Sequence, residues 1–288
     1  MTDEEHDRLK AAIDALPTGE RTPIVRTLVQ QFEALEEGQS VNVLYETGAY
    51  AGIVHEVRSY GIRFKDRSWT SFATGDGVTL AKFNAASHDV VRHTVTAIEI
   101  IEPIYIPTIT DAFWCPGAFE AWVASVPWAD RTTARRECFM SDPDGVEYTY
   151  GEGRGQRTYT SVPLDGFTDE VMNLVNEEMV RHGWGPMSGC FLNRYDTKKN
   201  ALHWHADDFE GMLHARHGVA IVSFGEPREI WWRLKGQTGV TPSEQRQLLA
   251  PGSLFIMPPG MQFTHEHRIP RGDRDMGMRV SMTFRAFR

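Results

Sequence analysis

The chain has 288 residues and a mass of 32.6 kDa, and its 30 Lys and Arg against 39 Asp and Glu give a formal charge of −9 at neutral pH. This balance argues against a general binder of polyanions, and 41% apolar with 24% charged residues argues against a mainly disordered chain. No apolar run approaches the roughly 20 residues that cross a bilayer, and the acidic start MTDEEHDRLK is unlike a signal peptide, so we expect an intracellular, cytoplasmic protein. The three cysteines form no CxxC pair, which indicates buried free thiols rather than disulfides or a thiolate zinc site.

Residues 1–107 are predicted to form an accessory domain. Apolar residues recur at helical spacing over residues 4–37 with a break at Pro17-Thr18-Gly19, which predicts a helical hairpin. Five short runs of β type follow, separated by Gly, Asp and Asn: VNVLYE, YAGIVHEV, GIRFKD, GVTLAKF and TVTAIEII. Five strands in about 65 residues indicate a small, strongly bent barrel, compatible with an SH3-like module.

Barrels of this size bind peptides or nucleic acids, and Tyr50, Tyr60 and Trp69 are expected on such a binding face. Residues 1–107 hold 10 Lys and Arg against 16 Asp and Glu, a net charge of −6, which disfavours non-specific binding to DNA. Two interpretations stay open for this domain, a module that binds a protein or nucleic-acid partner and a scaffold.

Residues 108–288 are predicted to form a second, α+β domain after the proline-containing linker EPIYIPTITDAF. Helices are expected around PGAFEAWVASV and over residues 168–182, where the apolar residues keep helical spacing. Strands are expected at ECFM, VEYTY, CFLNRY, HGVAIVSFG, EIWWRLK, SLFIMP and RVSMTFRAF. This order favours a β-sandwich with helices on one side.

The tripeptide His205-Ala206-Asp207 places an imidazole and a carboxylate on the same face of an extended chain. A third ligand would come from His265 or His267, about 60 residues later, on a strand that returns beside the first. Two histidines and one carboxylate form the facial triad of non-haem Fe(II) oxygenases, although zinc hydrolases use the same set. The alternative is a surface ion pair.

The C-terminal strand alternates cleanly. One face carries Val280, Met282, Phe284 and Ala286, and the other carries Arg279, Ser281, Thr283 and Arg285. The two arginines are about 20 Å apart along the strand, and their inward-reaching side chains would leave room for a short dicarboxylate, which guanidinium groups bind well. The alternative is a barrel strand with a solvated polar face.

A further pair of polar side chains lies ten residues before His205. In Asn193-Arg194-Tyr195, an amide and a phenol share one face of another strand, and both are suitable hydrogen-bond partners for a carboxylate or keto oxygen.

Four strings occur in order along the C-terminal part: LNRYDTKKNALHWHADDFEG, IVSFGEPREIWWRL, LLAPGSLFIMPPGMQFTHEHRIP and RVSMTFR. They resemble the ordered motifs N-x-Y, H-x-D, S-x-G-x-x-R, a Gly-Ser-hydrophobic strand, H-x-[IVL]-P and R-x-[NS]-x-T-F-R of the AlkB family of Fe(II)/2-oxoglutarate dioxygenases. The likeness is close from Leu192 to Phe287 and extends loosely back to about Phe113. It implies a double-stranded β-helix, or jelly-roll, dioxygenase domain with flanking helices.

The resemblance also implies the site residues. Fe(II) would be held by His205, Asp207 and His267, the last at the start of the H-x-[IVL]-P motif, with His265 as the alternative third ligand. O₂ and 2-oxoglutarate would be the co-substrates. The residues that would bind 2-oxoglutarate are Arg279 and Arg285, assisted by Asn193, Tyr195 and Ser281, the last at a position where the family often has Asn.

The segment EYTYG followed by GRGQRTY resembles the substrate lid of the family, which presents aromatic rings and positive charge to a flipped base. Stacking on Tyr148 or Tyr150 would contribute about 1 to 3 kcal/mol per base, and Arg154 and Arg157 would contact phosphates. The alternative is a structural hairpin.

Two further positions are candidates for the substrate site. Asp208 would face the substrate, although Phe209 departs from the commoner Asp-Glu pair of the family. Trp204 and the pair Trp231-Trp232 would wall the site, with core packing as the alternative.

The leading hypothesis is oxidative dealkylation of N-alkylated nucleobases in DNA or RNA, with release of succinate, CO₂ and formaldehyde. One alternative is a 2-oxoglutarate-dependent hydroxylase of a nucleobase, protein or small molecule that gives a stable alcohol. Another is a non-catalytic binding module on the same fold, and a zinc hydrolase is disfavoured because its mechanism has no need of the two arginines. The last 21 residues hold six arginines against two aspartates, so nucleic acid could be captured at a local basic site despite the acidic average.

Overall fold

The computed structural model describes residues 23–45, 48–58, 61–74, 77–84, 86–112, 117–129, 135–150, 156–207, 217–239, 241 and 244–287. Its contacts divide the chain into two units, Met1–Ile101 and Glu102–Arg288. The division falls before the expected boundary at residue 107, because strand β7 (Ile104–Ile106) pairs with β16 (Leu254–Met257) of the second unit. Within the described ranges, none of the helices has the length and apolar character that a membrane span requires.

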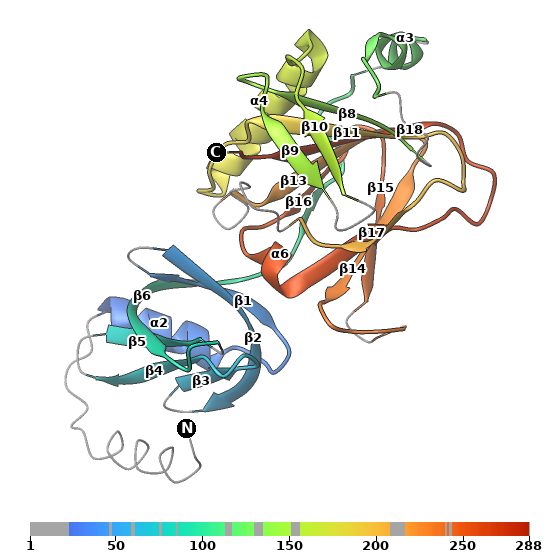
Figure 1. The fold of residues 1–288 in the computed structure, drawn as a ribbon. Helices are drawn as coiled ribbons and strands as arrows, with labels where there is room; N and C mark the ends of the chain where they lie inside the picture. Colours follow the sequence, from blue (N-terminus) through green and yellow to red (C-terminus); the bar gives the residue numbers. More distant parts are fainter. Residues whose placement is uncertain are drawn as a thin grey trace. The chain divides into compact units, whose positions relative to one another are not determined.

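The first unit contains a helix and a closed barrel (Figure 1). Helix α2 (Pro23–Glu33) precedes the strands β1 (Ser40–Tyr45), β2 (Gly48–Arg58), β3 (Gly61–Phe64), β4 (Trp69–Thr74), β5 (Gly77–Phe83) and β6 (Val90–Ile100). Each strand pairs antiparallel with the next, and β6 pairs with β1. The interior is filled by apolar side chains that are at most 1% exposed, including Val43, Val54, Ile62 and Leu80, together with Phe32 of α2.

The barrel has six strands, one more than the sequence predicted. Strand β4 escaped prediction because Ser and Thr dominate it, and Thr70 is buried where an apolar residue would be expected. Its hydroxyl accepts a hydrogen bond from the backbone N–H of Ile62 at 3.2 Å, which explains how a polar residue is accommodated there. The first half of the expected helical hairpin lies outside the described residues, and the likeness to SH3 modules stays a prediction.

The prediction that Tyr50 lies on an exposed binding face of the barrel is wrong. Its side chain is 8% exposed, packs edge-on against Phe64 and donates a hydrogen bond to Asp66 at 2.8 Å. Burial and the neighbouring Asp66 raise the pKa of the Tyr50 phenol well above its usual value. Trp69 is half-buried, and Tyr60 lies outside the described residues.

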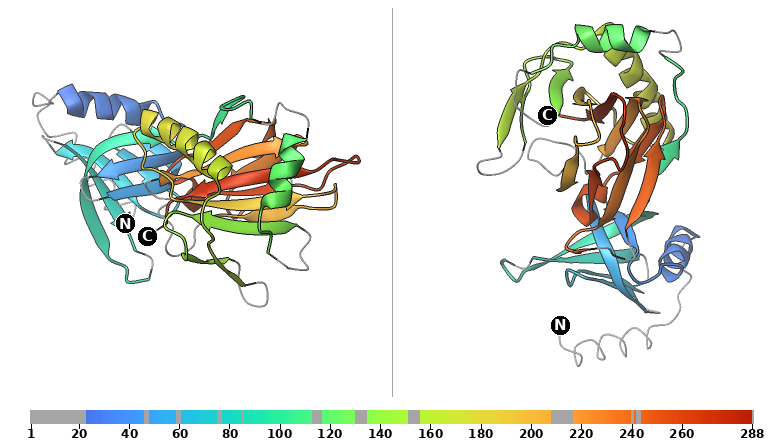
Figure 2. Two further views of the ribbon diagram at one scale, coloured as in Figure 1. Left: turned by 90° about the horizontal axis from the view of Figure 1, so that it is seen from above. Right: turned by 90° about the vertical axis from the view of Figure 1, so that its right-hand side faces the viewer.

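The second unit is built around two antiparallel sheets (Figures 1 and 2). The larger has the strand order β7-β16-β13-β18-β11-β8, with β8 (Arg136–Ser141), β11 (Gly189–Tyr195), β13 (Val219–Gly225) and β18 (Arg279–Arg285). The smaller has the order β12-β17-β14-β15, with β12 (Leu202–His205), β14 (Arg228–Leu234), β15 (Gln245–Leu249) and β17 (His265–Ile269). A hairpin of β9 (Glu147–Tyr150) and β10 (Arg157–Thr160) and the short helix α6 (Met261–Thr264) complete the framework.

Helices α3 (Ala118–Ser125) and α4 (Gly166–Arg181) pack against one face of the six-stranded sheet (Figure 2). Asp165 caps the N-terminus of helix α4. Its side chain accepts a hydrogen bond from the backbone N–H of Thr168 at 2.6 Å and satisfies one free donor of the first turn. Its apolar side chains meet the alternate residues of the sheet in one continuous core. From β18, this core receives Val280, Met282 and Phe284.

The opposite face of β18 is buried as well. Arg279, Ser281, Thr283 and Arg285 are each at most 6% exposed, so the alternation predicted from the sequence is present and the solvated face that was the alternative is not. This face is directed toward the four-stranded sheet. Arg285 contacts Asp207, which follows β12, and Trp232 of β14 packs against Phe255 of β16. The polar residues of β18 therefore line the space between the two sheets.

Candidate active site

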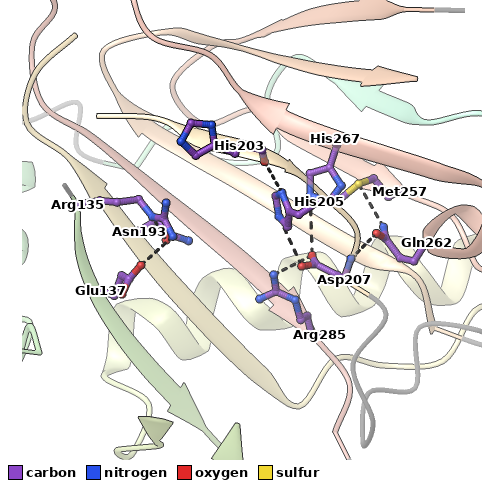
Figure 3. A network of polar contacts seen from close by, with 10 residues as sticks. All are labelled: Arg135, Glu137, Asn193, His203, His205, Asp207, Met257, Gln262, His267 and Arg285. Carbon is purple, nitrogen blue, oxygen red and sulfur yellow. Dashed lines mark hydrogen bonds and ion pairs between the residues drawn. The ribbon is translucent and has the colours of Figure 1, made fainter. Parts of the chain in front are cut away.

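Two histidines and one aspartate meet at the edge of the four-stranded sheet (Figure 3). His205 ends β12 and pairs in register with His267 of β17, and Asp207 follows His205 by two residues. One ligand atom from each lies within 4.8 Å of the others. His205 Nε2 is 3.8 Å from Asp207 Oδ1, and His267 Nε2 is 4.0 Å from Asp207 Oδ2. His265, the alternative third ligand, is not part of this group.

A backbone carbonyl fixes the tautomer of His205. Its Nδ1 lies 2.8 Å from the carbonyl oxygen of His203, an atom that can only accept a hydrogen bond. Nδ1 therefore carries the proton, and Nε2 presents a lone pair toward Asp207. This arrangement is typical of imidazoles that bind metal ions.

The electrostatics keep all three groups in the protonation state that a metal ion requires. Burial lowers the pKa of His205, and burial together with His205 lowers the pKa of His267 to about 3, so both imidazoles are neutral at neutral pH. Burial would raise the pKa of Asp207, but the neighbouring Arg285, His267 and His205 outweigh it and hold that pKa below its usual range. Asp207 is therefore ionised.

Two residues hold Asp207 in place. Arg285 donates a hydrogen bond from Nη2 to Asp207 Oδ2 at 2.7 Å, and the backbone N–H of Asp207 donates to Gln262 Oε1 at 2.8 Å. The amide of Gln262 is itself oriented by a contact of 3.3 Å from Nε2 to the sulfur of Met257. The other carboxylate oxygen, Asp207 Oδ1, is buried and has no hydrogen-bond partner among the described residues.

A divalent transition-metal ion fits these residues. The donor set is two neutral imidazoles and one carboxylate, as in the facial triad of non-haem iron sites. An ion would also provide the partner that Asp207 Oδ1 lacks, and a buried carboxylate oxygen without a partner is costly. The three residues leave further coordination positions for other ligands.

A second polar centre lies around Arg279 at the other end of β18. Arg279 is fully buried and donates from Nη2 to Ser223 Oγ at 2.8 Å, while its Nε and Nη1 have no hydrogen-bond partner in the part of the chain that the structure describes. The guanidinium groups of Arg279 and Arg228 each lie 5.2 Å from the ring centre of Tyr195. Burial lowers the pKa of Arg279 to about 10, and it stays charged at neutral pH. A buried cation with free N–H groups is suited to an anion.

A small pocket opens beside His205. It is lined by Arg135, Glu137, Tyr148, Phe191, Asn193, Leu202, His205 and Arg285. Arg135 donates to Asn193 Oδ1 at 3.0 Å and to Glu137 Oε1 at 2.8 Å, so the predicted co-substrate residue Asn193 is already engaged by a neighbour (Figure 3). Glu137 is 2% exposed and also accepts from Arg157 at 3.4 Å and from the hydroxyl of Tyr159.

Sequence reasoning missed Arg135, Glu137 and Gln262. Arg135 meets Asn193 across 58 residues of sequence, and Gln262 meets Asp207 across 55. Neither contact has a local signal, because both depend on which strands become neighbours. The buried Glu137 is the only one of the three with a hint in the sequence, as a charge in front of the apolar run CFM.

The predicted substrate residues are distributed differently from expectation. Tyr148 lines the pocket, but its ring is 4% exposed and packs against Phe139, Phe191 and Phe287, with the Arg285 guanidinium 5.8 Å from its centre. It is a buried wall rather than an exposed stacking platform. Asp208 and Arg154, and the side chain of Tyr150, lie outside the described residues.

Trp204 does not wall the pocket. Its ring lies between the guanidinium groups of Arg233 and Arg268, at 4.1 and 4.5 Å, on the face of the sheet opposite to His205. Strand alternation explains the correction, because neighbouring residues of a strand point to opposite faces. Trp231 also lies on that opposite face, beside Arg268, whereas Trp232 points inward onto Phe255.

No family model matches the chain. It is similar to two curated proteins named DNA oxidative demethylase ALKBH2. It is 29% identical over 142 residues to the one from Mus musculus, with 48% of this chain and 59% of that protein covered, and 26% identical over 189 residues to the one from Arabidopsis thaliana, with 56% and 58% covered. The chain thus spans less than two thirds of the length of either relative.

A solved structure titled "The structure of OsALKBH1" covers 64% of this chain and 97% of its own at 14% identity and a TM-score of 0.41, a likeness too low to support an argument. The two sequence similarities are more informative, although their identity is low. They support an AlkB-like family for this chain.

Proposed function

We propose that the second unit is a jelly-roll domain that binds Fe(II) and 2-oxoglutarate and that the protein removes alkyl groups oxidatively from nucleobases of DNA or RNA. The observation that carries the proposal is the group of His205, Asp207 and His267, with ligand atoms within 4.8 Å of one another and in the protonation states of metal ligands. Asp207 of this group contacts the buried Arg285, and the buried Arg279 lies on the same face of β18, a combination that a hydrolytic zinc site does not need.

The arginines suit the co-substrate, which carries a carboxylate at each end. Arg279 would bind the distal carboxylate, because its Nε and Nη1 are buried without partners and a charge-assisted pair would satisfy both. Tyr195 lies beside Arg279 and would assist, and Ser281 is buried on the same face of β18. The proximal end would lie near Arg285, which orients the metal ligand Asp207.

When bound, Fe(II) with 2-oxoglutarate and O₂ supplies the oxidising chemistry that hydroxylates a C–H bond and yields succinate and CO₂. The chain keeps His205 and His267 neutral, keeps Asp207 ionised, and orients the three through His203, Gln262 and Arg285. The rings of Tyr148 and Phe191, together with Leu202, form apolar walls of the pocket beside His205 and would limit the access of water when substrate is bound. If the hydroxylated carbon is an N-methyl group, the hemiaminal releases formaldehyde and the free base.

The nucleic-acid substrate is supported by the names of the two relatives, which are DNA oxidative demethylases. Arg157 pairs with Glu137 at 3.4 Å, and its side chain is 34% exposed, so it would also contact phosphates. The alternatives from the sequence keep the same site: a hydroxylase with a stable alcohol product, or a binding module in which the metal serves structure.

The test is turnover with reconstituted protein. The protein, with both units present, is loaded with Fe(II) without oxygen. It is then supplied with O₂ and 2-oxoglutarate, alone and with methylated or unmethylated single-stranded and double-stranded DNA and RNA. Succinate together with formaldehyde, dependent on a methylated nucleic acid, supports the demethylase. Succinate with a hydroxylated product and no formaldehyde supports the hydroxylase, and the absence of succinate under all conditions contradicts the dioxygenase. His205→Ala serves as the inactive control.

A further inference from the structure

The four-stranded sheet carries a ladder of alternating guanidinium and indole groups on the face away from the candidate metal ligands. The ladder consists of Arg233, Trp204, Arg268, Trp231 and Arg246. Successive separations from guanidinium carbon to ring centre are 4.1, 4.5, 4.4 and 6.0 Å, which are distances of favourable cation–π contact. We call this group the arginine–tryptophan ladder.

The arginine–tryptophan ladder includes residues of the two strands that carry the candidate histidine ligands. Trp204 directly precedes His205, and Arg268 directly follows His267. His205 and His267 are register partners in β12 and β17, and neighbouring residues of a strand face opposite sides. The contact between Trp204 and Arg268 therefore joins β12 to β17 directly behind the histidine pair.

The strand that carries His205 is short and marginal in its sheet. Strand β12 has four residues and, among the strands that the structure describes, pairs with β17 alone. Its register with β17 shifts between Leu202 and His205, which leaves Leu202 with Ile269 and His205 with His267 as the paired positions. A register shift interrupts the regular pattern of backbone hydrogen bonds between two strands, and Trp204 lies within the interrupted stretch.

Of the two cations that contact Trp204, Arg233 is fixed by polar contacts and Arg268 by ring contacts. The guanidinium of Arg233 donates to Glu266 Oε1 at 2.6 Å and to the carbonyl oxygen of Gly239 at 2.9 Å, and its side chain is 9% exposed. Arg268 lies between the rings of Trp204 and Trp231. The ring of Trp204 on the edge strand thus contacts one cation from β14 and one from β17, and these contacts oppose sliding or peeling of β12.

We propose that Trp204 is a positioning residue for the metal ligand His205, acting through its contacts with Arg233 and Arg268. This inference rests on the proposed function, because it requires a metal ion at His205, Asp207 and His267. Partners that orient metal ligands without touching the metal commonly affect metal affinity strongly. The arginine–tryptophan ladder fills that role from behind the sheet, with ring contacts in place of hydrogen bonds.

The test measures binding of Mn(II) to the metal-free protein, with both units present, by the loss of the electron paramagnetic resonance signal of the free ion. The variants are Trp204→Leu, which removes the ring, and Trp204→Phe, which keeps an aromatic face. The matched control is Trp184→Leu, because Trp184 is also half-buried and stacked on another ring, His182 at 4.9 Å, and it packs against the core on the helix side of the larger sheet. Thermal unfolding of each variant is measured in parallel.

We expect Trp204→Leu to weaken Mn(II) binding by about tenfold, Trp204→Phe to stay within about twofold of the wild type, and Trp184→Leu to leave Mn(II) binding unchanged while lowering the melting temperature. Wild-type affinity in Trp204→Leu, equal losses in Trp204→Leu and Trp184→Leu, or a Trp204→Phe variant as weak as Trp204→Leu would each overturn the proposal. A second variant, Arg268→Met, removes one of the two cations and should weaken Mn(II) binding in the same direction even if Trp204→Leu does not fold.

The two proposals fail in different ways. A wild-type protein that binds no Mn(II) contradicts the metal centre and with it the positioning role. If the wild type binds Mn(II) but Trp204→Leu binds it equally tightly, only the positioning role is contradicted. With Co(II) in place of Mn(II), the visible absorption of the bound ion reports ligand geometry, and we expect it to change in Trp204→Leu and not in Trp184→Leu.

Discussion

Arg285 donates a hydrogen bond of 2.7 Å to Asp207, so a buried guanidinium and a buried carboxylate that are 78 residues apart in sequence neutralise each other between the two sheets. The pair links β18, the strand with the alternating polar face, to the candidate metal centre. Arg285 was predicted from the sequence as a co-substrate residue, and the structure adds this direct contact with Asp207. Because of this contact, a substitution at Asp207 also changes the environment of the Arg285 charge.

Removal of Asp207 should cost much more stability than removal of His205. Asp207→Ala leaves the Arg285 charge buried without its carboxylate, which typically costs about 3 to 5 kcal/mol, whereas His205→Ala removes a neutral ring. Urea unfolding of both metal-free variants, followed by tryptophan fluorescence, measures the difference, and only Trp69 of the eight tryptophans lies in the first unit. Both variants should lose succinate formation. Equal unfolding free energies in the two variants would contradict the view that Asp207 neutralises Arg285.

Arg279→Met should separate co-substrate binding from stability. Loss of the cationic partner of the distal carboxylate should weaken 2-oxoglutarate binding by about 100-fold. The ligand-free protein should keep or gain stability, because an incompletely paired buried charge disappears. Calorimetric titration of 2-oxoglutarate into the Mn(II)-loaded protein gives the affinity. Arg274→Met is the control, since Arg274 is 71% exposed in an ion pair with Glu226. Unchanged 2-oxoglutarate binding in Arg279→Met would remove Arg279 from the site.

The sequence predicted what is encoded locally. The alternation in β18 assigned Val280, Met282 and Phe284 to the core and the arginines to the other face, and both faces are where the pattern put them. The two-residue spacing of His205 and Asp207 likewise predicted two ligands on one side of a strand, and the register of β12 with β17 adds His267. These features need only the period of a strand and the return of one strand beside another.

Contacts between strands that are far apart in the sequence could not be predicted. Trp204 was expected in the site because it adjoins His205, yet adjacency in a strand places it on the opposite face, beside Arg233 and Arg268. Tyr50 was expected on a surface, but its ring closes the barrel interior against Phe64. An aromatic side chain suits both the predicted and the observed location of these two residues. Which location it takes depends on its neighbours in three dimensions.

The stability of the metal-free protein should fall as the pH drops from about 6.5 toward about 4. Burial holds the pKa of His265 at about 4 and that of His267 at about 3, below the ordinary 6.5, so the unfolded chain takes up protons in this range before the folded one does. Each such histidine contributes a slope of up to about 1.4 kcal/mol per pH unit, and its stabilisation is complete above its unfolded pKa. Asp207, whose pKa is lowered, adds a further loss only below its own unfolded value near 3.8.

His265→Asn tests this origin of the slope. Urea unfolding at about pH 7.5 and about pH 5 should show a smaller loss of unfolding free energy in the variant than in the wild type. His265 lies outside the group of three ligand atoms, so Mn(II) binding at neutral pH serves as the control for an intact centre. A variant with the same pH slope as the wild type would assign the acid sensitivity to other groups.

The buried network around Glu137 should behave as one unit. Glu137 accepts from Arg135 at 2.8 Å, from Arg157 at 3.4 Å and from the Tyr159 hydroxyl, and burial and Glu137 raise the pKa of Tyr159 to about 12. Glu137→Ala removes the acceptor of all three and should cost about 3 to 5 kcal/mol, whereas Tyr159→Phe removes one hydrogen bond and should cost about 1 to 3 kcal/mol.

A double-mutant cycle distinguishes a coupled network from independent contacts. Once Glu137 is gone, the Tyr159 hydroxyl has already lost its acceptor, so Tyr159→Phe should cost little or even restore stability in the Glu137→Ala background. Urea unfolding of the wild type, both single variants and the double variant gives the coupling, and Mn(II) affinity should stay unchanged because none of the three candidate metal ligands belongs to this network. Strictly additive losses would mean that Glu137 and the Tyr159 hydroxyl contribute to stability independently of each other, and would contradict the coupled network.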